Sequence, residues 1–233
     1  MNPSANRTPR PLLLSLAVAT GAALPGYAAA QALEEVIVTA QHREESLQDV
    51  PIAITAIGSE ELRAADISDL NAISLRTPGF SMGTFTPAQP QLYIRGIGSN
   101  ADGASEDQSV VVFLDGVYLG RTAGQAFDLF DLERIEVLRG PQGTLYGKNA
   151  AGGALNIISQ KPADEFEGAV EVSGGDLGYF ATRAKVSGPL GDRLAGKLSM
   201  SYKERDGYVE SVVSDLDDFN SYDSTAVRGQ LLS

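Results

Sequence analysis

The sequence has no cysteine, no tryptophan and a single histidine, His42, among 233 residues. Without cysteine, neither a disulfide framework nor a thiolate metal site can form. One histidine excludes a multi-histidine metal site and leaves few options for a general base. Basic residues are also scarce, 18 against 30 acidic ones, and the formal charge of -12 argues against nucleic acid as a partner. We therefore expect no enzyme, no metal site, no cofactor and no nucleic-acid binding.

The N-terminus has the three parts of a secretory signal. Arg7 and Arg10 precede the uncharged stretch "PLLLSLAVATGAAL", and the small residues of "YAAAQA" follow it. The apolar stretch is short for a membrane span, which needs about 20 residues. We expect a signal peptide over residues 1–30, cleaved after Ala30 or alternatively after Ala32, and therefore an exported protein.

Residues 47–161 are predicted to form one compact α+β domain. In "VVVFLDGVYLG", Asp115 and Gly116 separate two β-rich runs, which indicates a tight hairpin with a primed turn. Two short helices are expected in "SEELRAADISDLNAISL", with Ser59 and Ser68 as N-caps and with apolar residues at Leu62, Ile67, Leu70 and Ile73. The loops are expected where periodicity is missing, at Ser81–Gln91 and Ser99–Gln108. Ahead of this domain, Val36–Thr39 is predicted to be an extended, exposed run without a neighbour.

From residue 165 the period changes to two. In "YFATRAKVSG", Phe180 and Val186 belong to an apolar face, whereas Arg183 and Lys185 belong to a polar one. About four such strands, joined by short turns and then by a long acidic loop, are typical of a transmembrane β-barrel. A soluble β-sandwich also alternates, but the signal peptide favours the barrel.

The glycine-rich stretch "LRGPQGTLYGKNAAGGALNII" resembles a phosphate-binding loop only superficially. The P-loop pattern requires glycine where Gln142 stands and a hydroxyl residue where Asn149 stands. The run "GIGSNA" from Gly96 imitates a dinucleotide fingerprint, but no helix is predicted after it. We therefore expect no nucleotide site.

A family resemblance accounts for the whole arrangement. The run "DLERIEVLRGPQGTLYGKNAAGGALNIISQKP" closely resembles the plug-domain motif of TonB-dependent outer-membrane receptors. "LYIRGIG" and "VVVFLDGVYLGR" resemble two further plug motifs in the order typical of that family, and "EEVIVTAQ" resembles a TonB box. The resemblance implies a TonB box and linker over 31–46, a plug over 47–161 and the first barrel strands over 165–233. In this family the plug sits inside a barrel of about 22 strands, so we expect the chain to be the N-terminal part of a longer receptor.

The same resemblance implies a function and its partners. A scarce solute, often a ferric siderophore chelate, would bind at the extracellular face of a receptor in the cell outer membrane. The box, consisting of Glu35, Val36, Ile37, Val38, Thr39 and Ala40, would then add as a strand to the periplasmic TonB protein. No covalent chemistry is required. The alternative function is a secreted β-rich binding module or adhesin without transport activity.

Two further groups of residues follow from the resemblance. Arg95 and Arg139 occupy the positions at which plug arginines pair with barrel glutamates, although both can equally be exposed arginines at strand ends. The two loops provide candidate ligand-facing residues, which can equally be ordinary solvated positions: Ser81, Met82, Phe85, Gln89, Asn100, Asp102 and Glu106.

Overall fold

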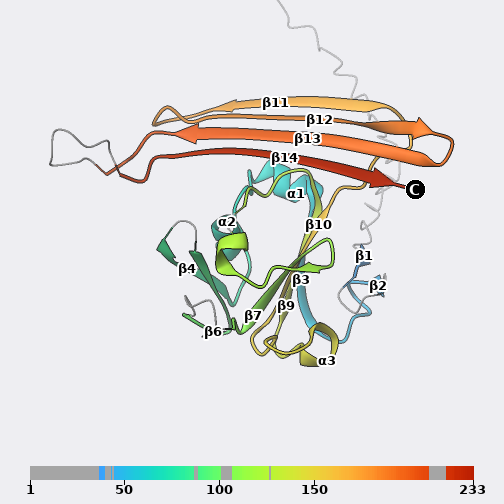
Figure 1. Cartoon of the computed structure of the whole chain (residues 1–233). Helices are drawn as coiled ribbons and strands as arrows, with labels where there is room; N and C mark the ends of the chain where they lie inside the picture. The colour runs from blue at the N-terminus through green and yellow to red at the C-terminus, as the bar shows by residue number, and fades with distance from the viewer. Residues whose placement is uncertain are drawn as a thin grey trace, which may run out of the picture. The chain divides into compact units, whose positions relative to one another are not determined.

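The computed structural model describes residues 37–39, 43, 45–86, 89–100, 107–125, 127–209 and 219–233, so the expected signal peptide lies outside the described part. Short strands and helices come first along the chain, and four long strands follow (Figure 1). The shorter elements are β1 (Ile37–Val38), β2 (Glu45–Ser46), β3 (Ala53–Gly58), α1 (Ser59–Ala64), α2 (Leu70–Ser74), β4 (Phe80–Thr86), β5 (Gln89–Ile94), β6 (Ile97–Gly98), β7 (Val110–Leu114), β8 (Val117–Tyr118), the 3-10 helix η1 (Thr122–Gln125), β9 (Leu132–Arg139), α3 (Gly143–Tyr146) and β10 (Gly153–Ser159). The long strands are β11 (Glu167–Gly174), β12 (Phe180–Gly191), β13 (Leu194–Arg205) and β14 (Tyr222–Leu232).

A five-stranded mixed sheet forms the centre of the plug. Its order is β3-β9-β10-β7-β8, and β10 runs parallel to β7 but antiparallel to β9. The predicted hairpin between β7 and β8 is confirmed: Asp115 and Gly116 have φ angles of 48° and 79°, as a primed two-residue turn requires.

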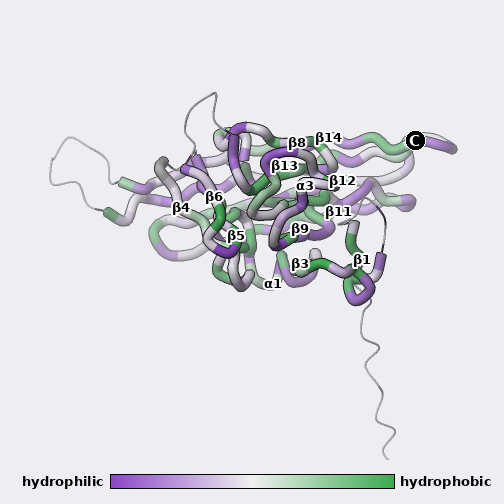
Figure 2. Tube along the Cα trace, turned by 90° about the horizontal axis from the view of Figure 1, so that it is seen from below, coloured by the Kyte–Doolittle hydropathy of each residue, from purple (hydrophilic) through white to green (hydrophobic). Residues whose placement is uncertain are grey.

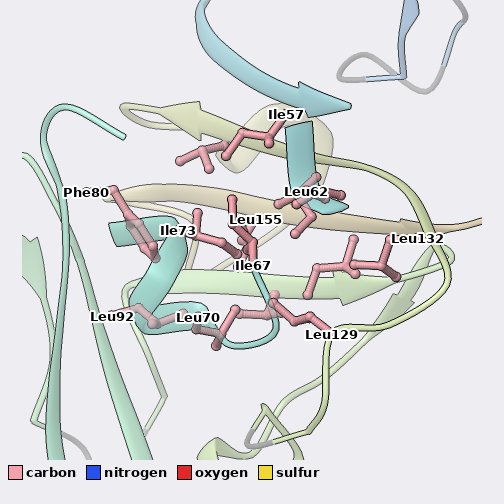
Figure 3. Packing of buried hydrophobic residues seen from close by; sticks show 14 of the residues in the cluster. Ile57, Leu62, Ile67, Leu70, Ile73, Phe80, Leu92, Leu129, Leu132 and Leu155 are labelled. Carbon is pink, nitrogen blue, oxygen red and sulfur yellow. The ribbon is translucent and has the colours of Figure 1, made fainter. Parts of the chain in front are cut away.

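Hydrophobic clusters cover both faces of this sheet, because successive side chains of a strand point to opposite sides. The larger cluster packs beneath α1 and α2 (Figure 3), and the apolar helix residues expected from the sequence are all buried in it: Leu62, Ile67, Leu70 and Ile73. The smaller cluster lies on the other face and includes Val38, Val111 and Leu138. In both views the β1–β2 pair and the β4–β6 sheet lie on opposite sides of the central sheet (Figures 1 and 2).

The predicted helix caps were wrong. Gly58 is the N-cap of α1, so Ser59 is already the first helical residue. Asp69 caps α2, where its Oδ1 accepts from the Ala72 amide at 2.8 Å. Aspartate serves as well as serine at this position, and the aspartate one residue later in the sequence took the role expected of Ser68.

The predicted loop over Ser81–Gln91 was also wrong. β4 and β5 pair antiparallel there, with an irregularity between Thr84 and Thr86, and β6 adds only to Tyr93 and Ile94. Pro90 is tolerated because β6 does not reach the free edge of β5 at that point, so no ladder bond is lost.

The strands β11–β14 form a separate antiparallel sheet in sequence order, which we call the wall. Hydrophobic and hydrophilic residues are interspersed along it (Figure 2). On β13, Lys197, Ser199, Ser201 and Lys203 are buried, whereas Leu198 and Met200 between them are exposed. The predicted two-faced pattern is confirmed, and its polar face contacts the plug. Among the described residues, no helix is both long and apolar enough to cross a membrane.

Candidate functional site

The first strand, β1, is docked on the plug. Ile37 and Val38 pair antiparallel with Ser46 and Glu45. Val38 is fully buried in the smaller hydrophobic cluster. The expectation of an exposed run without a neighbour was therefore wrong for this segment, because the chain turns back within a few residues and supplies β2 as a partner. Glu35, Val36 and Ala40 of the expected box lie outside the described residues.

A buried carboxylate on β9 holds the residue that follows β1. Glu136 has no exposed side-chain surface, and its Oε1 accepts from the Thr39 amide at 2.7 Å and from Arg134 Nε at 2.8 Å. The Thr39 hydroxyl lies 3.2 Å from the same oxygen. Because Ile135 belongs to the cluster on the opposite face, the alternation of the strand directs Arg134 and Glu136 towards β1. A charge buried in this way is retained only when it is paired and hydrogen-bonded.

The glycine-rich stretch supplies the rest of this site, which we call the Glu136 cluster: Arg134, Glu136, Tyr146 and Asn156. Asn156 Nδ2 donates to Tyr146 Oη at 2.6 Å and to Glu136 Oε2 at 3.3 Å. Burial raises the pKa of the Tyr146 phenol, and the nearby Glu136 charge raises it further, against the lowering effect of the Asn156 hydrogen bond. The phenol is therefore neutral at physiological pH.

The glycines of this stretch are needed because other backbone atoms lie close to their Cα atoms. A Cβ on Gly153 would lie 2.2 Å from the Leu138 carbonyl oxygen, and one on Gly152 would lie 2.8 Å from the Ile97 carbonyl oxygen. Gly153 also has a φ of +149°, which other residues rarely adopt. Close approach of other backbone segments, β9 at Gly153 and β6 at Gly152, rather than a phosphate, therefore requires glycine here.

Sequence reasoning missed the Glu136 cluster, although all of its members lie within the quoted plug motif. The available signal was the charge pattern of "LERIEVLRG". Ionisable residues inside an otherwise β-prone run of a central strand are almost never fully buried unless they are paired. That rule predicts a buried partner for Glu136 but does not say which segment supplies it.

The candidate ligand-facing residues are distributed unevenly. Ser81 and Asn100 are exposed, and the Tyr93 hydroxyl donates to the Asn100 side chain. Gln89 is half-buried in β5, and Phe85 lies within β4. Met82 instead packs against the larger hydrophobic cluster, because the β4–β5 pairing turns it inward. Asp102 and Glu106 lie outside the described residues.

Arg95 and Arg139 lie near each other on the plug. Arg139 Nη1 donates to the Pro78 carbonyl at 3.1 Å. Arg95 is exposed, has a φ of 52°, and its Nη1 would lie 3.6 Å from a Cβ on Gly140. Neither arginine forms an ion pair within the part of the chain that the structure describes. Their pairing with barrel glutamates remains a prediction.

The plug and the wall meet through charged groups, with acids on the plug and bases on the wall. Arg183 of β12 pairs with Asp66 at 3.0 Å, and a half-open pocket of about 200 Å³ lies between α1, the segment before β9 and the wall. Ligand pockets usually measure about 300–1,000 Å³. This pocket is therefore too small for a metal chelate, and we do not assign the solute to it.

Comparison with known proteins identifies the protein family that has this fold. The family model "TonB-dependent Receptor Plug Domain" matches residues 46–154. The chain belongs to the TonB-dependent receptors. Among curated relatives, the vitamin B12 transporter BtuB of Photobacterium profundum is 30% identical over 190 residues, covering 78% of this chain and 30% of that protein. The ferrichrome outer membrane transporter/phage receptor of Escherichia coli is 33% identical over 174 residues, covering 70% of this chain and 22% of that protein.

A solved structure agrees with these relatives. The ferric yersiniabactin uptake receptor FyuA from Yersinia pestis superposes with a TM-score of 0.69 at 26% identity, covering 77% of this chain and 28% of that one. The chain thus spans 30% or less of the length of each of these three proteins. The relatives are receptors and transporters, not enzymes, so the expected family, the plug-and-wall fold, the non-enzymatic character and the location in the cell outer membrane are confirmed.

Proposed function

We propose that this chain provides the plug and the energy-coupling end of an outer-membrane receptor that takes up a scarce solute, such as a ferric siderophore chelate. The relatives named above are a vitamin B12 transporter, a ferrichrome transporter and a ferric yersiniabactin receptor, which supports this class of solute. The exposed residues Ser81 and Asn100, with Gln89, Phe85, Asp102 and Glu106, are the proposed ligand side of the plug. Arg95 and Arg139 are proposed to face barrel carboxylates.

The observation that carries the proposal is the docking of β1. Within the described part of the chain two residues of this strand pair with β2, and the strand lies on the opposite side of the central sheet from β4–β6. A two-residue strand pair is marginal by itself, so the strand can leave once its contacts at Val38 and Thr39 open, and it can then pair with another protein. The residues Glu35–Ala40 are therefore proposed to add as a strand to the periplasmic TonB protein, with main-chain bonds supplying affinity and alternate apolar side chains setting the register.

In this proposal β1 cannot be docked on the plug and bound to the TonB protein at the same time. Val38 is fully buried against the plug, so it cannot contact a partner until β1 leaves. A peptide of residues 33–42 has no such restraint and should bind the C-terminal domain of TonB more tightly than the whole chain does.

The test is a binding titration of that domain with the peptide and with two variants. Val38→Pro removes a backbone donor from the middle of the box and should weaken binding at least several-fold. His42→Pro, beyond the box, is the matched control and should have little effect. Equal affinity of the wild-type and Val38→Pro peptides would refute strand addition through this segment.

A further inference from the structure

Two buried lysine–aspartate pairs join β13 of the wall to the segment that precedes β9. Lys197 Nζ lies 2.6 Å from Asp131 Oδ2, and Lys203 Nζ lies 2.6 Å from Asp128 Oδ1. All four side chains are at most 7% exposed. The Asp128 oxygen has no hydrogen bond of good geometry, so its contact with Lys203 is Coulombic.

Two serines between the lysines complete the arrangement. Ser199 Oγ donates to Asp131 Oδ2 at 2.6 Å, and Ser201 Oγ donates to the Asp128 carboxylate. The sequence of this part of β13 is "KLSMSYK", so lysine, serine, serine and lysine fall at alternate positions on one face. Each aspartate therefore receives one lysine and one serine from adjacent positions of the same face.

The next strand binds the same segment. The Arg228 guanidinium of β14 lies 4.8 Å from the centre of the Phe130 ring, and its Nη1 donates to the Phe130 carbonyl at 2.9 Å. Residues 128–131, which we call the docking segment, thus contact two neighbouring wall strands. Further along β14, Gln230 Nε2 donates to Ser159 Oγ at the end of β10.

Buried ion pairs are a poor means of gaining stability. Desolvating both charges offsets most of their attraction, and apolar replacements of similar volume are often as stable or more stable. The best-attested role of such pairs is to specify one alignment among several. A wall strand needs such a device, because a regular two-residue alternation looks the same after every second residue.

We propose that the docking segment fixes the register of the wall on the plug. It does so by pairing Asp128 and Asp131 with the K-x-S-x-S-x-K pattern of β13. A slip of one residue would place Leu198 and Met200 against the two carboxylates. A slip of two residues, about 7 Å along the strand, would leave either Asp128 or Asp131 facing the two serines without a lysine. Only the observed register gives both buried carboxylates a cation. This role is independent of the solute that the receptor takes up.

The absence of cysteine allows the register to be read by engineered cross-links in the whole chain, refolded in detergent micelles. Ser159→Cys with Gln230→Cys, joined by a short bifunctional thiol reagent that replaces the lost length of the glutamine, reports the observed register, because Gln230 Nε2 contacts Ser159 Oγ. Ser159→Cys with Leu232→Cys reports a slip of two residues, since residues 230 and 232 share a face. We expect the reagent to give the first cross-link and little of the second.

Charge variants then test whether the lysine–aspartate pairs set this register. Asp131→Lys or Lys197→Asp alone should lower the yield of the 159–230 cross-link at least several-fold, and the two together should restore most of it. Lys148→Asp is the matched control, because its pair with Asp107 is exposed, at 82% and 55%. It should leave the yield unchanged.

A leucine variant covers the case in which single changes prevent folding. Replacing Asp128, Asp131, Lys197 and Lys203 together by leucine leaves no unpaired charge, so the chain should still fold. If the ion pairs set the register, this variant should form both cross-links. A leucine variant that forms only the 159–230 cross-link, as the chain with its native charges should, would overturn the proposal. Single charge reversals that leave the wild-type yield intact would overturn it as well.

Discussion

Replacing Glu136 by alanine should release β1 from the plug. Glu136 is the acceptor for the Thr39 amide, and no other acceptor for that amide is present among the described contacts. The same carboxylate also accepts from Arg134, whose side chain is only 11% exposed. The change therefore acts both on the docked strand and on the stability of the whole plug.

The effect on the opening of β1 and the effect on the stability of the plug differ in size. A hydrogen bond to a charged group contributes about 1.5–3 kcal/mol, so opening at Thr39 should become about 10- to 150-fold more frequent. Removing one partner of a buried pair costs about 3–5 kcal/mol. Arg134 keeps a contact with Glu133, which is 41% exposed, so the lower end of that range is expected. Against a typical total of about 5–15 kcal/mol, the plug should remain folded.

Hydrogen exchange on the whole chain separates the two effects. The Thr39 amide reports local opening at β1, whereas the Leu155 amide in the buried strand β10 reports opening of the plug as a whole. In Glu136→Ala the Thr39 exchange rate should rise about 10- to 150-fold and stay above the Leu155 rate, which marks the opening at β1 as local. Glu133→Ala is the matched control, since it removes a neighbouring carboxylate of the same strand and leaves the Thr39 bond intact.

The opposite result would refute this reasoning. If the Thr39 exchange rate in Glu136→Ala equals that of the wild type, or if Thr39 exchanges only as fast as Leu155, the carboxylate does not hold β1. If Glu133→Ala has the same effect as Glu136→Ala, the general charge of β9, rather than the specific bond, governs docking.

Three further predictions concern stability, each measured by chemical denaturation of the whole chain. Gly153→Ala should lower the free energy of unfolding by about 1–3 kcal/mol or more, because the added carbon would overlap the Leu138 carbonyl; an unchanged midpoint would contradict the close approach. Asp69→Ala should cost about 1 kcal/mol through loss of the α2 cap, and Asp69→Asn much less. Since the pKa of Tyr146 is raised in the fold, its contribution is present below the ordinary tyrosine value of about 10 and is lost as the pH rises above it. Tyr146→Phe should therefore flatten the loss of stability at alkaline pH, and an equally steep loss would show that this phenol is not responsible.

Features that depend on neighbouring residues could be predicted from the sequence. The turn at Asp115 and Gly116 needs only two residues able to adopt positive φ. The two faces of the wall follow from the two-residue period, and Leu198 and Lys197 lie on the sides that this period assigns to them. The observed N-cap of α2 is one position after the predicted one, because the adjacent residues Ser68 and Asp69 can both cap a helix.

Features that depend on distant residues could not be predicted in the same way. The position of β1 depends on Glu136, which is 97 residues from Thr39, and no local pattern connects the two. The β4–β5 pair was missed because its prolines suggest a loop, whereas the short reach of β6 makes Pro90 acceptable. Likewise, the lysines of β13 appeared as one polar face, and only the fold shows that Asp128 and Asp131 lie against them.

The order of strands in the central sheet has a consequence for how the exported chain folds. β3 pairs with β9, and β9 pairs with β10, so residues 53–58 have no sheet partner until residues 132–139 are present. Sheets built from such distant pairings form slowly, because a long loop must close before any contact rewards it. Most of the plug must therefore emerge from the export machinery before its centre can assemble. The strand that leaves first, β1, has to wait for the arrival of Glu136 before it can dock.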